Sequence, residues 1–154
     1  MPSFVYATLA EDKERPAPPS AAADIVAAVE GRPVWDNLQV SPEGTAQFPF
    51  MNISWHKGHG FDIQCFEKPE SDSDFLATER VLSAPEVYVE LGGQTQELWP
   101  KQLFVPSNLA VMAVRYFLDT GRQDPSLVWV PIARFPRRTV PRCERWSGTA
   151  PIRW

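Results

Sequence analysis

The stretch VPSNLAVMAVRYFLDTGRQDPSLVW, residues 105–129, contains the best-marked helix of the chain and a strand directly after it. Pro106 stands at the start, where its missing N–H costs nothing, and Ser107 is the expected N-cap. Gly121 is expected to end the helix in the left-handed conformation. The sequence therefore predicts a helix over about 107–119, with a short buried strand following it.

Apolar side chains occupy most of the circumference of this predicted helix. One face of a helical wheel holds Leu109, Met112, Ala113, Tyr116 and Phe117. Ala110, Val111, Val114 and Leu118 extend that face around the cylinder. A helix this apolar must be covered on most sides, so we expect it to pack on a sheet as core architecture.

The residues before this helix predict a second helix and several strands. SAAADIVAAVEG, residues 20–31, is typical of an amphipathic helix with Ser20 as N-cap and Gly31 just past its end. From Pro33 to Trp99 the apolar residues recur with the alternation of strands, interrupted by turn signals at PEG, KGHG and GG. We predict an α+β fold: an antiparallel sheet of about five to seven strands, with the N-terminal helix and the helix of the C-terminal half packed on it.

The chain divides into three parts. A chain of 154 residues has the size of one domain, and its 44% hydrophobic and 22% charged residues are typical of a soluble globular protein. We predict an extended segment over 1–19, a single α+β domain over 20–133 and a basic tail rich in Pro and Arg over 134–154. No apolar run approaches the roughly 20 residues of a membrane span, and the N-terminus lacks the basic start of a signal peptide. With only two cysteines, we expect a cytoplasmic protein without membrane contact.

Charge is distributed unevenly along the chain. Of 15 basic and 19 acidic residues, six basic and one acidic residue follow position 133, which leaves nine basic and 18 acidic residues before it and a net charge of −9 there. An acidic body repels nucleic acid and attracts basic partners. The alternative is that this acidity only keeps the protein soluble.

The side chains that most often carry chemistry do not form a known motif. His56 and His59 lie at the turn formed by residues 57–60, and Cys65 follows, but the spacing of a zinc motif is absent. We therefore expect solvent-facing histidines, no bound metal or other cofactor, and a buried, inert thiol at Cys65. The sequence has no phosphate-binding loop or nucleophile elbow, and no spacing singles out a catalytic carboxylate pair. We expect a protein that is not an enzyme, with no catalytic residues.

The segment EKPESDSDFLATER, residues 67–80, concentrates carboxylates and reads as an exposed acidic loop between strands, although FLATERVL is also a strand candidate. A solvated loop without function is the alternative. The residues that we predict to contact a partner are those of this segment and two from the strands before it: Glu67, Glu70, Asp72, Asp74, Glu79, Asp62 and Trp55.

Two stretches carry a resemblance to a known family. ELWPKQLFVPSNLAVMAVRYFLDTGRQDPSLVWV, residues 97–130, and FPFMNISW, residues 48–55, resemble the first-numbered immunity-protein family of bacterial polymorphic toxin systems. The resemblance covers about residues 20–133 and is strongest over 98–131. It implies a protein that binds and neutralises a cognate toxin, often a nucleic-acid deaminase. The tail after Ala133 departs from the family pattern, so no role carries over to it.

The implied function agrees with the charge of the chain. A deaminase toxin holds an anionic nucleic acid in a basic groove around a zinc site, and an acidic inhibitor can occlude that groove. We therefore expect a basic toxin domain as partner, no nucleic-acid binding by this chain, and a monomer when free. Two alternatives are a small-molecule-binding or accessory domain that uses the concave face of the sheet, and a structural subunit of a larger assembly.

Overall fold

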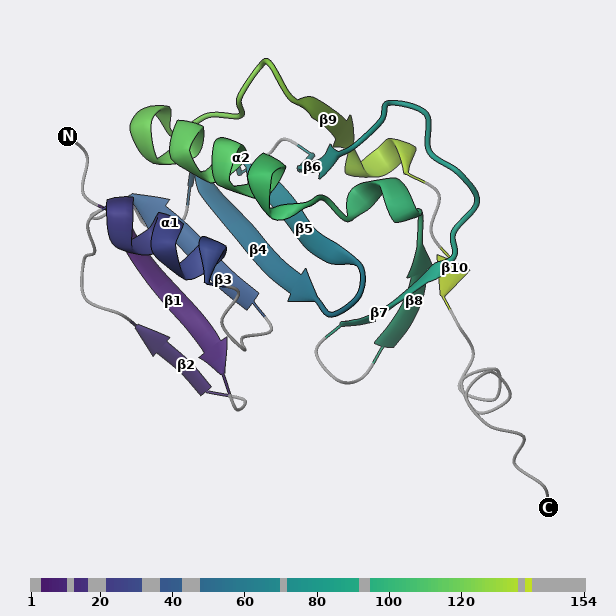
Figure 1. The fold of residues 1–154 in the computed structure, drawn as a ribbon, viewed down its shortest axis with the longest axis horizontal. Coiled ribbons are helices and arrows are strands. Elements are labelled where there is room, and N and C mark those ends of the chain that lie inside the picture. The colour runs from purple at the N-terminus through teal and green to yellow at the C-terminus, as the bar shows by residue number, and fades with distance from the viewer. Residues whose placement is uncertain are drawn as a thin grey trace. The chain divides into compact units, whose positions relative to one another are not determined.

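In the computed structural model, the described residues are 4–10, 13–16, 22–31, 37–42, 48–69, 72–91, 95–135 and 138–139. They belong to two compact units, and the fold is α+β as predicted (Figure 1). The first unit comprises residues 1–80 and 102–134, and the second comprises residues 81–101 and 135–154.

A seven-stranded antiparallel sheet forms the frame of the first unit, with strand order β2-β1-β3-β4-β5-β6-β9. Each neighbouring pair of strands in that order is antiparallel. The strands are β1 (Phe4–Ala10), β2 (Lys13–Pro16), β3 (Asn37–Pro42), β4 (Phe50–His56), β5 (Gly60–Phe66), β6 (Asp74–Ala77) and β9 (Val128–Pro131).

Both α-helices of the described chain, α1 (Ala22–Glu30) and α2 (Ser107–Thr120), lie side by side on one face of this sheet (Figure 1). An exposed ion pair joins them, with 3.7 Å between the Arg115 guanidinium and the Glu30 carboxylate. Such a pair contributes little to stability, so the apolar faces of the helices hold them on the sheet.

Alternation along β4 and β5 separates the helix-covered face from the opposite one. The odd-numbered residues of these strands are buried with the helices in one core, except Trp55, which is half-buried against it, because successive side chains of a strand point to opposite faces. This core consists chiefly of Leu38, Val40, Met51, Ile53, Phe61, Ile63, Cys65 and Leu76 from the sheet, Ile25, Val26 and Val29 from α1, and Ala110, Ala113, Val114, Phe117 and Leu118 from α2.

The end of α2 is confirmed, whereas the predicted N-cap is wrong. Gly121 adopts φ 70° and ψ 16°, and its N–H donates to the carbonyl of Phe117. At the other end Pro106 occupies the N-cap position and no side chain caps the helix. Ser107 is instead the first helical residue, because the extended backbone of Pro106 already turns the chain into the helix.

The segment before α2 pairs with the start of β5, on the side of that strand away from β4. The backbones of Phe61 and Val105 exchange two hydrogen bonds of 2.8 and 2.9 Å, and the N–H of Thr78 donates to the carbonyl of Gln102. Gly60 has φ +122°, and a Cβ there would lie 2.6 Å from the Val105 carbonyl oxygen. A side chain at position 60 would therefore disrupt this bridge.

The second unit contains a three-stranded sheet of order β10-β8-β7. Its strands are β7 (Val87–Leu91), β8 (Thr95–Trp99) and β10 (Arg138–Thr139). The indole N–H of Trp99 donates to the buried carboxylate of Glu97 at 2.8 Å, and the Trp99 ring lies edge-on to Phe135. The strand candidate EVYVEL is thus confirmed as β7, but it belongs to a separate sheet rather than the predicted single one.

Two segments contain strands that the sequence did not predict. Residues 1–19, predicted as an extended segment, include β1 and β2, and β1 pairs with β3 in the main sheet. The tail 134–154 includes β10, which pairs with β8. The predicted turn around Glu43 lies outside the described residues, although β3 and β4 pair as neighbours on either side of it.

Candidate protein-binding surfaces

The even-numbered residues of β4 and β5 form a polar strip on the sheet face opposite α1 and α2. We define the β4–β5 polar strip by Asn52, Ser54, His56, Asp62 and Gln64. The register places Asn52 opposite Gln64 and Ser54 opposite Asp62. All members except Asp62 are half-buried, so solvent reaches this face of the two strands.

An aromatic group borders the strip at one end. Phe50 and Phe66 face each other across the two strands and stack with their ring centroids 4.3 Å apart. Phe48 lies 5.1 Å from Phe50 in a tilted arrangement. All three rings are half-buried, so part of their surface is open to a binding partner.

His56 and Asp62 close the other end of the strip. Nε2 of His56 is hydrogen-bonded to Oδ2 of Asp62, and the histidine is the donor because an ionised carboxylate only accepts. The ring of Phe104 lies edge-on to the His56 ring, with 5.2 Å between their centroids, and its centroid is 5.8 Å from that of the His59 ring. The side chains of His56 and Asp62 are 22% and 11% exposed, so the pair is shielded without being closed off.

One acceptor of the strip has no partner. Oδ1 of Asn52 is buried, and no donor among the described residues reaches it. A buried acceptor without a hydrogen bond costs about 1–3 kcal/mol, and such an atom in a folded protein calls for an explanation.

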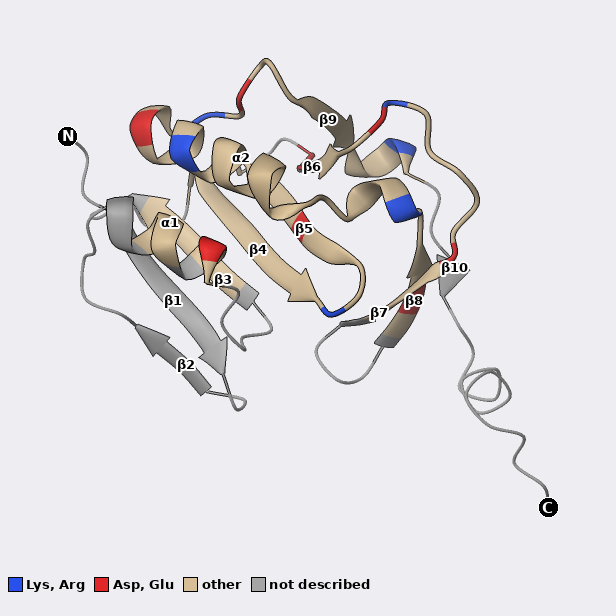
Figure 2. Cartoon of the chain, viewed as in Figure 1, with Lys and Arg blue, Asp and Glu red and all other residues tan. Residues whose placement is uncertain are grey.

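A second polar group lies at the end of the sheet where β5 leads into β6. The side-chain amide of Gln123 donates to the Asp74 carboxylate at 2.6 Å, and the Gln123 backbone N–H donates to Glu67 at 3.3 Å. Gln123 therefore connects the loop after α2 to the segment between β5 and β6. Figure 2 shows acidic residues at the C-terminal end of α2 and in the chain leading into β6.

The predicted acidic contact residues differ in accessibility. Glu67, Asp72 and Glu79 are exposed. Asp74 is half-buried and engaged by Gln123. Glu70 lies outside the described residues.

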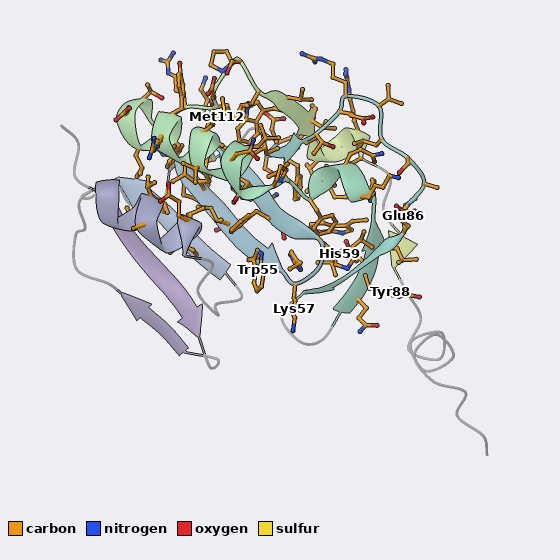
Figure 3. All side chains as sticks on the ribbon, in the orientation of Figure 1. Trp55, Lys57, His59, Glu86, Tyr88 and Met112 are labelled. Atoms are coloured by element: carbon orange, nitrogen blue, oxygen red, sulfur yellow. The ribbon has the colours of Figure 1, made fainter. Side chains whose placement is uncertain are left out.

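The two predicted contact residues on the strands before this segment are less accessible than expected. Asp62 is only 8% exposed and belongs to the β4–β5 polar strip. Trp55 is half-buried on the helix-covered face, packed against the core. Figure 3 shows Trp55 near the end of β4, with Lys57 and His59 at the adjoining turn.

The prediction of one exposed loop over residues 67–80 is wrong in its middle. Residues 74–77 form β6, in which Phe75, Leu76 and Ala77 are buried, so the strand candidate FLATERVL is confirmed over residues 75–77. This short apolar run is held by pairing with β9, a partner about fifty residues away that the local pattern does not reveal. Asp72 and Glu79 thus lie beyond opposite ends of β6 rather than on one loop.

Cys65 is the buried thiol that the sequence predicted, with 1% of its surface exposed. Burial, and to a smaller degree the negative charges of Glu67 and Asp74, raise the pKa of this thiol from 9.0 to about 12. A raised pKa in the folded state stabilises the neutral thiol relative to the unfolded chain. That contribution is complete below about pH 9 and is lost as the pH rises toward 12.

We expect the Cys65 thiol to resist an aromatic disulfide reagent at pH 8 in the folded protein and to react fully in denaturant. A Cys143→Ser background leaves Cys65 as the single thiol, so the absorbance of the released thiolate reports this residue alone. Rapid stoichiometric labelling without denaturant would show that the site opens readily.

The polar strip was not recognised in the sequence, although its signal was present. The alternation of FMNISWH puts Asn52, Ser54 and His56 on the face opposite the apolar Met51 and Ile53, so the polar side of β4 is visible in the pattern. The role of Gln123 leaves no local signal, because its partners Glu67 and Asp74 lie about fifty residues before it. Among the described residues, no group of three or more His, Cys, Asp or Glu side chains is arranged to hold a metal ion.

Comparison with profiles of protein families, with curated proteins and with solved structures finds no significant match. In the part of the chain that the structure describes, no helix is both long and apolar enough to cross a membrane.

Proposed function

We propose that this protein binds and neutralises a bacterial toxin, a basic nucleic-acid deaminase, by occluding its substrate groove. The observation that carries the proposal is the set of exposed carboxylates around β6, Glu67, Asp72 and Glu79, on a chain whose first 133 residues carry a net charge of −9. A groove that holds anionic nucleic acid is basic, so it attracts such a surface.

The frame that presents these carboxylates supports the proposal. β6 is paired on both sides, and Gln123 connects Glu67 and Asp74 to the loop after α2. Acidic groups held on a rigid frame lose little freedom when they bind, which favours affinity. The resemblance of residues 97–130 to immunity proteins points to the same function, which needs no catalytic turnover by this chain.

The proposed site of action is the cytoplasm, where an escaped toxin would reach nucleic acid. In that setting fast association matters as much as affinity, because a toxin that turns over substrate does damage until it is bound. Electrostatic attraction raises association rates by orders of magnitude at low salt. The negative charge of this protein therefore serves to speed its association with the toxin.

We expect a neighbouring gene to encode a deaminase-like toxin domain, and that domain is the reagent for the test. Expression of that domain should arrest growth, and co-expression of this protein should restore it. Purified toxin should lose its deaminase activity on a single-stranded DNA oligonucleotide in a 1:1 ratio with this protein. Undiminished deamination at a molar excess of this protein, with no complex by size-exclusion chromatography, would reject the proposed function.

Charge reversal of the exposed acids should slow complex formation. The variant with Glu67→Lys, Asp72→Lys and Glu79→Lys is expected to associate with the toxin domain about tenfold or more slowly at low ionic strength, with a flatter dependence on salt. Stopped-flow fluorescence at several salt concentrations measures this.

A matched control separates the local surface from total charge. The variant with Glu30→Lys, Glu86→Lys and Asp119→Lys changes the net charge by the same amount at exposed residues elsewhere. It should retain most of the wild-type rate. Equal slowing in both triple variants would mean that the surface around β6 has no special role.

A further inference from the structure

The sheet face that bears the β4–β5 polar strip offers hydrogen-bond acceptors to a partner. Both helices of the described chain cover the opposite face (Figure 1). Asn52 Oδ1 is buried without a donor among the described residues, whereas the Asn52 side chain as a whole is half-buried, so its amide must rotate to present this oxygen to a partner. The Asp62 carboxylate accepts a hydrogen bond from His56 and has lone pairs for another donor. One acceptor of the strip therefore lacks a donor, and a second has room for another donor.

These groups follow one another along the strands. Side chains on one face of a strand repeat about every 7 Å, so the rings of Phe50 and Phe66, the amides of Asn52 and Gln64, and the carboxylate of Asp62 form successive steps. One side chain several ångströms long can pass over the rings and reach the amide step with its polar end. Aromatic rings beside polar acceptors allow one side chain to make apolar contacts and hydrogen bonds together.

A guanidinium group suits this surface better than other donors. It has five N–H donors in a plane and no acceptor, and it stacks on aromatic faces. Its charge complements Asp62 and the acidic first 133 residues of the chain. A lysine ammonium has the charge but lacks the planar fork that could reach Asn52 Oδ1 while stacking on Phe50 or Phe66.

We propose that the β4–β5 polar strip is a docking surface for an arginine side chain of the toxin, held by Asn52 Oδ1 and the Asp62 carboxylate beside the Phe50–Phe66 stack. This inference rests on the proposed function for the identity of the partner. The toxin needs arginines to hold phosphates, and the strip supplies acceptors in their place. The unpartnered acceptor of Asn52 is then a group whose donor comes from the partner.

The first test compares binding with stability. Asn52→Val removes the acceptor and introduces a β-branched side chain, which suits a strand. We expect the dissociation constant for the toxin domain to rise at least tenfold, while the denaturation midpoint of the free protein stays unchanged or rises. Asp62→Asn should weaken the complex similarly. Met112→Ala, on the outer surface of α2, should leave the affinity unchanged, and Figure 3 shows its place.

A second test needs no toxin. Blocked arginine (N-acetyl-arginine methylamide) is titrated into the isotope-labelled protein at millimolar concentrations, with blocked lysine as comparison. We expect chemical-shift changes confined to residues 50–56 and 61–66 and to the side-chain amides of Asn52 and Gln64. Blocked lysine should bind more weakly, and Asn52→Val should abolish the response. Scattered shifts, or equal shifts in the variant, would overturn the arginine site.

The two tests distinguish the failure of this inference from the failure of the proposed function. If the toxin is not bound but blocked arginine perturbs the strip, the proposed function fails and the arginine site stands. If the toxin is bound with wild-type affinity by Asn52→Val and Asp62→Asn, the proposed function stands and the strip is not the docking surface.

Discussion

Replacing Phe117 by alanine is expected to lower the free energy of unfolding by about 3–5 kcal/mol, as for other buried aromatic side chains. Phe117 is 0% exposed and belongs to the core that α2 forms with the sheet. The lost ring removes apolar burial and leaves a cavity that rigid neighbours fill only in part. Urea denaturation followed by tryptophan fluorescence measures the change.

Met112→Ala is the matched control on the same helix. Its side chain is 45% exposed, and alanine favours a helix at least as well as methionine. We expect a change of about 0.5 kcal/mol or less in the free energy of unfolding. If Phe117→Ala cost no more than Met112→Ala, the assignment of this helix face to the core would be wrong.

Gly60→Ala is expected to have the second large effect. At φ +122° a residue with a Cβ is strained, which costs about 1–3 kcal/mol. The added methyl would also lie 2.6 Å from the Val105 carbonyl oxygen, so the chain must move and the hydrogen bonds between Phe61 and Val105 are weakened or lost. We expect a total loss of about 3 kcal/mol or more, measured by urea denaturation.

Gly58→Ala separates backbone strain from this contact. Gly58 also has a positive φ, +82°, but a Cβ there would have nothing within 4 Å. Only backbone strain should then lower the free energy of unfolding, by about 1 kcal/mol. Equal costs for the two substitutions would show that the approach of Val105 contributes nothing.

The parts of the fold that the sequence predicted are those whose signals are local. The helix at 107–120 has its period, its apolar face and Gly121 within one stretch, and the turn at 57–60 has its glycines between two alternating runs. The division into two sheets has no such signal, because it depends on which strands pair. Residues 4–16 were missed because the nearby prolines and charged residues outweigh a short apolar run.

The candidate surface was predictable only in composition. The sequence shows how many carboxylates stand near residue 70, but accessibility depends on distant partners: Asp74 on Gln123, and residues 75–77 on β9. Asp62 was expected to be accessible, yet its neighbour His56 on the paired strand shields it. A single sequence does not contain these pairings, since each joins residues that lie apart in the chain.

The bridge between Phe61 and Val105 also bears on how the protein folds as it leaves the ribosome. The β4–β5 hairpin can form as soon as residue 66 has emerged. The backbone of Phe61, however, can pair with Val105 only after that residue, 44 positions later, has also emerged. During that interval the nascent chain exposes an apolar strand edge that can pair with another chain. Synthesis that stalls before Val105 should therefore yield aggregates.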